Sequence, residues 1–85
     1  MAVHPNATAA PPLEVVLSEV VASLAFAAHS YLVPSEPDLA SAEIAIDVAA
    51  DAFERIAPRL STDERSALAA LLTDLRMTFV RKRGL

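Results

Sequence analysis

The residues of this sequence that could do chemistry begin with His29, Ser30 and Tyr31, where a titratable base lies beside two hydroxyl groups. A histidine paired with a serine is the minimal arrangement for nucleophilic catalysis. Adjacent positions on a helix point about 100° apart, so His29 and Ser30 do not face each other if the segment is helical. We therefore interpret His29 as a residue near a helix end, where an imidazole stabilises the helix dipole. No catalytic residue is predicted.

Carboxylates recur at helical spacing in a second segment, at Glu43, Asp47, Asp51 and Glu54. Metal sites built from carboxylates in helical bundles also use Glu-x-x-His pairs, and this segment has no histidine. The sequence has no cysteine, and His4 and His29 cannot make a zinc site by themselves. We predict no metal and no other cofactor. Asp51 and Arg55 are expected to form an ordinary helical ion pair, and the acidic ridge is either solvated or an electrostatic docking face.

A basic cluster near the end of the sequence consists of Arg81, Lys82 and Arg83. Domains that bind nucleic acid usually have a basic isoelectric point, whereas the isoelectric point of this sequence is near 4.9. Bases in the last turn of a helix also stabilise its dipole without any ligand. Contact with nucleic acid through this cluster is therefore the weaker hypothesis. Asp74 and Arg76 cannot pair with each other on one helix, so we expect Arg76 to reach a carboxylate across an interface.

The length and the charge distribution of the sequence limit the kind of domain that can position these groups. A chain of 85 residues forms at most one small domain with a thin core. Residues 1–54 carry eight acids and no Lys or Arg, and residues 55–85 carry seven bases and three acids. Such asymmetry can steer partners or align neighbouring copies. The sequence lacks the pattern of a signal peptide, so we expect a cytoplasmic protein without a membrane segment.

The first helix is predicted over residues 13–32, after a disordered tail over residues 1–12. Apolar residues recur there at spacings of three and four, which is the pattern of a helix. The other side of this helix is also apolar, because Val15, Ala22, Ala25 and Phe26 lie outside the stripe. Two other helices of so small a domain cannot cover all of it, so a second copy is the natural cover. The candidate residues for self-association are Val16, Val20, Leu24, Phe26, Tyr31 and Arg76.

Two further helices follow from caps and breaks. Asp38 can cap a helix over residues 39–57, which ends before Pro58. Its inward residues are expected to be Ala42, Ala45, Ile46, Ala49, Phe53 and Ile56. Ser61 and Glu64 then form a capping box. This box predicts a third helix over residues 62–82, with Gly84 as its stop.

Three stretches resemble a bacterial family catalogued as domain of unknown function 1844. They are "ASLAFAAHSYL", the capped segment "DLASAEIAIDVAADAFERI", and "LSTDERSALAALLTDLRMTFV". Family members usually have Gly at the position of Val33. The family has no assigned enzymatic activity, so the resemblance implies no catalytic residues. Genes of some relatives neighbour translation genes, which implies an association with translation and no mechanism.

These observations predict an all-α domain of three helices over residues 13–83, a helical hairpin plus a third amphipathic helix, completed by dimerisation. We expect a non-catalytic interaction or assembly protein that forms a homo-oligomer, with a dimer favoured, and that can also have a protein partner of unknown identity. The alternative is an accessory factor linked to nucleic acid or translation that uses the basic cluster.

Overall fold

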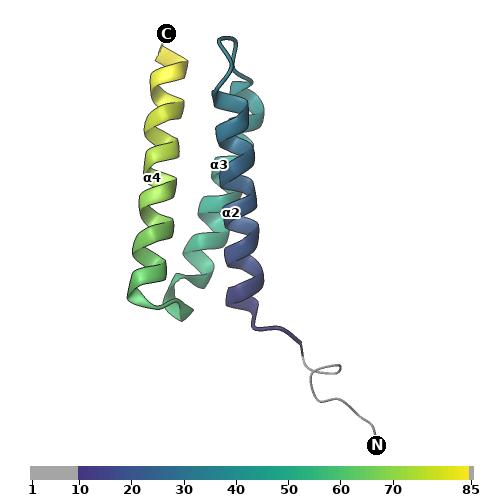
Figure 1. Cartoon of the computed structure of the whole chain (residues 1–85), viewed down its shortest axis with the longest axis vertical. Helices are drawn as coiled ribbons and strands as arrows, with labels where there is room; N and C mark the ends of the chain where they lie inside the picture. Colours follow the sequence, from purple (N-terminus) through teal and green to yellow (C-terminus); the bar gives the residue numbers. More distant parts are fainter. Residues whose placement is uncertain (1–9, 85) are drawn as a thin grey trace, which may run out of the picture.

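A computed structural model describes residues 10–84, so residues 1–9 of the tail predicted over residues 1–12 lie outside the described residues. The chain forms α2 (Leu13–Leu32), α3 (Leu39–Ile56), a short 3₁₀ helix, η1 (Ala57–Arg59), and α4 (Thr62–Gly84). α2 and α4 run in the same direction and α3 runs opposite to both (Figure 1). The predicted all-α fold of three helices is confirmed.

α2 and α3 form a helical hairpin whose turn is fixed by a side-chain cap. The Ser41 backbone N–H donates to the Asp38 carboxylate at 3.0 Å, as the sequence predicted. This hydrogen bond stabilises the ionised carboxylate and lowers the pKa of Asp38. Val33, which follows the last residue of α2, has φ −66° and ψ −41°. This is a right-handed helical conformation that a β-branched residue can adopt, so the turn requires no glycine.

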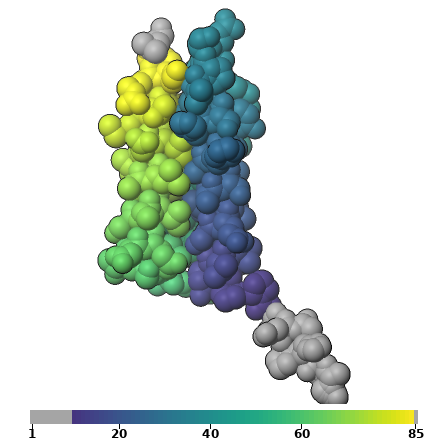
Figure 2. All heavy atoms as spheres, viewed as in Figure 1, coloured from purple at the N-terminus to yellow at the C-terminus, as the bar shows by residue number. Residues whose placement is uncertain are grey.

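The core lies between the hairpin and α4, and small residues line much of it. Its buried apolar residues on the hairpin are Val21, Ala25, Ala28, Leu32, Ala42, Ala45, Ile46, Ala49 and Ile56. α4 adds Leu72 and Leu75. Five of these hairpin residues are alanines, so the axes of α2 and α3 can approach closely. α2 and α3 contact each other more extensively than either contacts α4. Figure 2 shows α4 lying along α2 as a separate column of atoms.

The start of α4 is fixed by the capping box. The Glu64 N–H donates to the Ser61 hydroxyl at 3.1 Å, and the Ser61 N–H donates to the Glu64 carboxylate at 3.0 Å. Both predicted bonds are therefore present, and the hydrogen bond to Ser61 lowers the pKa of Glu64. Before this box, Ala57 belongs to η1, so α3 ends at Ile56, one residue earlier than predicted.

α4 runs two residues beyond its predicted end at residue 82, and two further predictions also differ from the structure. Gly84 does not stop α4 by adopting a left-handed conformation, because it has no positive φ and is itself the last residue of the helix. The bases of the last turn instead lie at the carbonyl end of the helix, where they complement the dipole. Ala25, expected outside the apolar stripe of α2, is only 2% exposed and belongs to the core.

Candidate interaction surfaces

The apolar residues of α2 divide into two adjacent rows, each repeating at alternating spacings of three and four. The inner row faces the core and consists of Val21, Ala25, Ala28 and Leu32. The outer row, defined here, consists of Leu13, Leu17, Val20, Leu24, Ala27 and Tyr31. The outer row contains no charged residue and is half-buried or exposed along its whole length. A spacing near 3.5 residues is the pattern by which one helix packs along another.

Two apolar residues of α3 extend this surface. Ile44 is 65% exposed and Val48 is 50% exposed, and they lie four residues apart on one side of the helix. Ile44 lines a shallow depression together with Leu24, Ala27 and Tyr31 of the outer row. We call the outer row together with Ile44 and Val48 the α2–α3 face. This face spans two helices, and Asp51 and Arg55, which pair at 3.2 Å, follow Ile44 and Val48 at helical spacing on α3.

A second surface lies on the other side of α2, in the groove toward α4. Phe26, which is 74% exposed, lines it with Ala22, His29 and the α4 residues Leu71 and Asp74. Phe26 is the most exposed large hydrophobic residue among the described residues. The groove combines its apolar residues with an imidazole and a carboxylate, whereas the depression on the α2–α3 face is lined by the hydroxyl groups of Tyr31 and Ser41 and by no charged residue.

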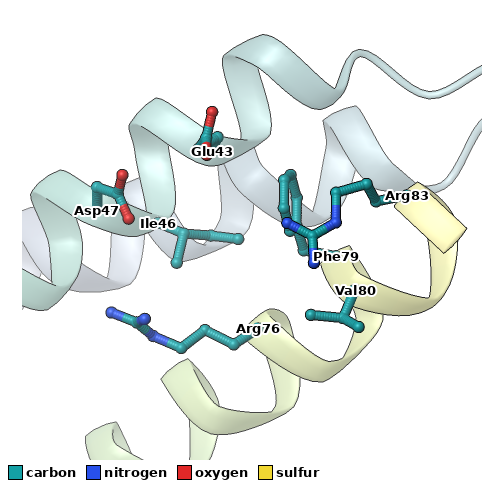
Figure 3. A pocket seen from close by; sticks show the side chains of 7 residues that line it. All are labelled: Glu43, Ile46, Asp47, Arg76, Phe79, Val80 and Arg83. Atoms are coloured by element: carbon teal, nitrogen blue, oxygen red, sulfur yellow. The ribbon is translucent and has the colours of Figure 1, made fainter.

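The third groove, between α3 and α4, is charged. Glu43 and Asp47 of α3 line it opposite Arg76 and Arg83 of α4, over a volume of about 340 Å³. Figure 3 shows the Arg76 side chain extending along this groove, with its guanidinium group on the side of Asp47. Arg76 makes no ion pair within 4.0 Å in the described part of the chain. The ion pairs found there are Arg55 with Asp51 at 3.2 Å and Arg59 with Glu14 at 3.7 Å.

The six residues predicted for self-association therefore do not form one surface. Leu24 and Tyr31 lie on the α2–α3 face, and Val20 shares their row. Phe26 lies in the groove between α2 and α4, and Arg76 lies in the groove between α3 and α4. Val16 is half-buried on α2, beside the outer row.

Five members of the α2–α3 face were not among the residues predicted for self-association: Leu13, Leu17, Ala27, Ile44 and Val48. The signal that could have found the α2 members is the regular spacing of the outer row, which starts at Leu13. Ile44 lies four residues before Val48, so the same helical periodicity points to both.

The residues weighed for catalysis are not arranged for it. The Ser30 hydroxyl donates to the Phe26 carbonyl at 3.1 Å, one helical turn earlier. His29 lies in the groove toward α4, whereas Tyr31 lies on the α2–α3 face. The three side chains thus point away from a common centre.

The remaining candidate groups are the acidic ridge on α3 and the basic cluster at the end of α4. The four carboxylates of the ridge are exposed, and the described residues contain no group of three or more His, Asp or Glu side chains placed to hold a metal ion. In the basic cluster, Arg81 donates to the Thr78 hydroxyl at 3.1 Å, and the Arg83 guanidinium lies 5.5 Å from the centre of the Phe79 ring. These contacts hold two of the three bases against α4 itself.

α2 is also long and apolar enough to cross a membrane by length and composition. Core helices of soluble proteins pass the same test, and here the inner row of α2 packs against α3 and α4. The length of α2 is therefore weak evidence for a membrane span.

The fold and its surfaces define a small three-helix domain whose most distinctive surface is apolar. The chain belongs to the family described as "Domain of unknown function (DUF1844)", whose model matches residues 14–81. The resemblance seen in the sequence is thus confirmed. No curated protein and no solved structure matches the chain.

Proposed function

We propose that this protein is a non-catalytic helical assembly protein that self-associates through its α2–α3 face. The observation that carries the proposal is the outer row of α2, which repeats like a packing row and yet stays half-buried or exposed along its length, although Leu24 packs partly against the core. Leu13, Val20 and Tyr31 of this row are 49%, 38% and 38% exposed. Contiguous apolar surface of this kind is typical of protein contact sites.

A homodimer is the simplest assembly that covers this face. The two-fold axis of a dimer places the same patch on both copies, so one self-complementary face is sufficient. A domain of this length also has a thin core, so burying a second apolar row adds stability that the monomer lacks. An apolar helix of a different partner protein would cover the same face.

The alternative, a nucleic-acid- or translation-linked accessory factor that uses the basic cluster, is less well supported. The cluster is small, and Arg81 and Arg83 contact Thr78 and Phe79 of their own helix. Non-specific binding to nucleic acid depends on several cations neutralising phosphates at once. Exposed carboxylates on α3 at the neighbouring groove oppose that binding.

Two matched variants test the proposal, Ile44→Asp and Phe26→Asp. Both replace a well-exposed apolar residue by a carboxylate, but Ile44 lies on the α2–α3 face and Phe26 on the opposite side of α2. An unpaired carboxylate buried in an interface costs several kcal/mol. We expect light scattering to give the mass of a monomer for Ile44→Asp and of a dimer for Phe26→Asp, with equal helicity by circular dichroism.

The reverse result would move the interface to the groove between α2 and α4. Dimers of equal stability for both variants would exclude the two surfaces, and the proposal would fail in this form. A monomeric mass for the unmodified protein would exclude self-association altogether.

A further inference from the structure

We infer that two copies pair with their α2 helices antiparallel, about a two-fold axis that passes between Val20 and Leu24. This inference rests on the proposed self-association and specifies its geometry. It follows from the outer row, because the spacings 4, 3, 4, 3, 4 read the same in both directions. An antiparallel partner therefore meets the row in register along its whole length.

The sizes of the paired side chains favour this arrangement. Antiparallel pairing sets Leu13 against Tyr31, Leu17 against Ala27, and Val20 against Leu24 of the other copy. Smaller residues thus meet larger ones, as dense packing requires. In-register parallel pairing sets every residue against its own copy. It would leave a gap between two Ala27 side chains and crowd two Tyr31 rings one turn away.

α3 contributes to the same contact near the axis. Val21 and Ala49 pack in one core cluster, so Val48 lies level with the middle of the outer row. Val48 is therefore close to the proposed axis, and Ile44 lies about one turn from it. The contact is then a four-helix core made of α2 and α3 from each copy.

The charge at the end of the face also favours the antiparallel pairing. Arg55 is exposed on the same side of α3 as Ile44 and Val48, near the level of the first turn of α2. Antiparallel pairing brings it toward the last turn of the other α2, where the negative end of the helix dipole attracts a cation. Parallel pairing would bring the two Arg55 side chains toward each other.

Cysteine cross-linking tests the geometry cleanly, because the natural chain has no cysteine. The double variant Leu17→Cys/Ala27→Cys is compared with each single variant. A disulfide needs Cα atoms within about 7 Å of each other. Ten helical residues span about 15 Å, so positions 17 and 27 of one chain cannot be bridged. Antiparallel pairing brings each of these positions beside the other one in the second copy.

Under mild oxidation we expect the double variant to run as a covalent dimer on a non-reducing gel, and each single variant to run as a monomer. Dimers formed by the single variants would show parallel pairing and overturn this inference, while leaving self-association intact. A dimeric mass in solution without any cross-link would likewise overturn the inference alone. A monomeric mass for the unmodified protein would instead overturn the proposed function.

A second pair of positions guards against a folding defect. Leu13→Cys/Tyr31→Cys changes the outermost layer of the same row, where the native side chains are 49% and 38% exposed. We expect it to form the same covalent dimer and to keep the helicity of the natural chain. If it folds and does not cross-link although the protein is dimeric, the antiparallel register is wrong.

Discussion

Replacing Ala49 with leucine should strongly destabilise the domain. Ala49 is fully buried and shares a core cluster with Val21 of α2 and Leu72 of α4. The close approach of the three helices at this level depends on a side chain of one carbon atom. Leucine adds three carbon atoms where neighbouring side chains already fill the space. Such overpacking costs about 1–3 kcal/mol, and forces the helices apart or the side chains out of their preferred rotamers.

The matched control is Ala40→Leu, which makes the same substitution at an exposed position of α3. Leucine and alanine have similar helix propensities, so the control should change the free energy of unfolding by less than about 0.5 kcal/mol. For a domain of this size, 1 kcal/mol corresponds to a change in Tm of about 4–8 °C. Thermal melts by circular dichroism, at equal protein concentration, measure the difference. Coincident melts of the two variants would refute the close packing of α2, α3 and α4 at Ala49.

Three further predictions concern the ends of the helices and of the chain. Ser61→Ala removes the acceptor for the Glu64 N–H and should cost about 1 kcal/mol in thermal melts; Ser66→Ala, one turn later, should have no comparable effect. Because the pKa of Glu64 lies below its ordinary value of 4.5, the stabilisation it provides is present above that pH and is lost as the pH falls through the lowered pKa. Glu64→Gln keeps a capping side chain and should make the decrease of Tm below pH 4.5 shallower, whereas an unchanged slope would assign that decrease to other carboxylates. Deleting residues 1–10 should leave helicity and Tm nearly unchanged, since this segment has no apolar periodicity, and a large loss of Tm would mean that it packs on the domain.

The helices and their caps could be predicted from the sequence because their signals are local. Asp38 and the Ser61–Glu64 box make the hydrogen bonds that their spacing indicates. The inward residues of α3 could also be predicted, because polar residues occupy most of its other side, where Ile44 and Val48 are the exposed apolar residues. Five of the six expected there are buried, and Phe53 is half-buried.

The contact surfaces could not be predicted in the same way. α2 is apolar around most of its circumference, so its sequence does not show which row faces its own chain. Only the packing of Val21 and Ala25 against α3 and α4 separates the inner row from the outer one. The same packing places Phe26 and Arg76 in two different grooves, although the sequence grouped them in one candidate interface.

The mass of the unmodified protein in solution shows whether the chain self-associates. Light scattering or sedimentation equilibrium at micromolar concentration should give the mass of two copies of the 9.0 kDa chain. Tm should also rise with protein concentration, because association stabilises the folded state by mass action. A mass near 9.0 kDa, from a protein that is fully helical and whose Tm does not depend on concentration, would exclude self-association.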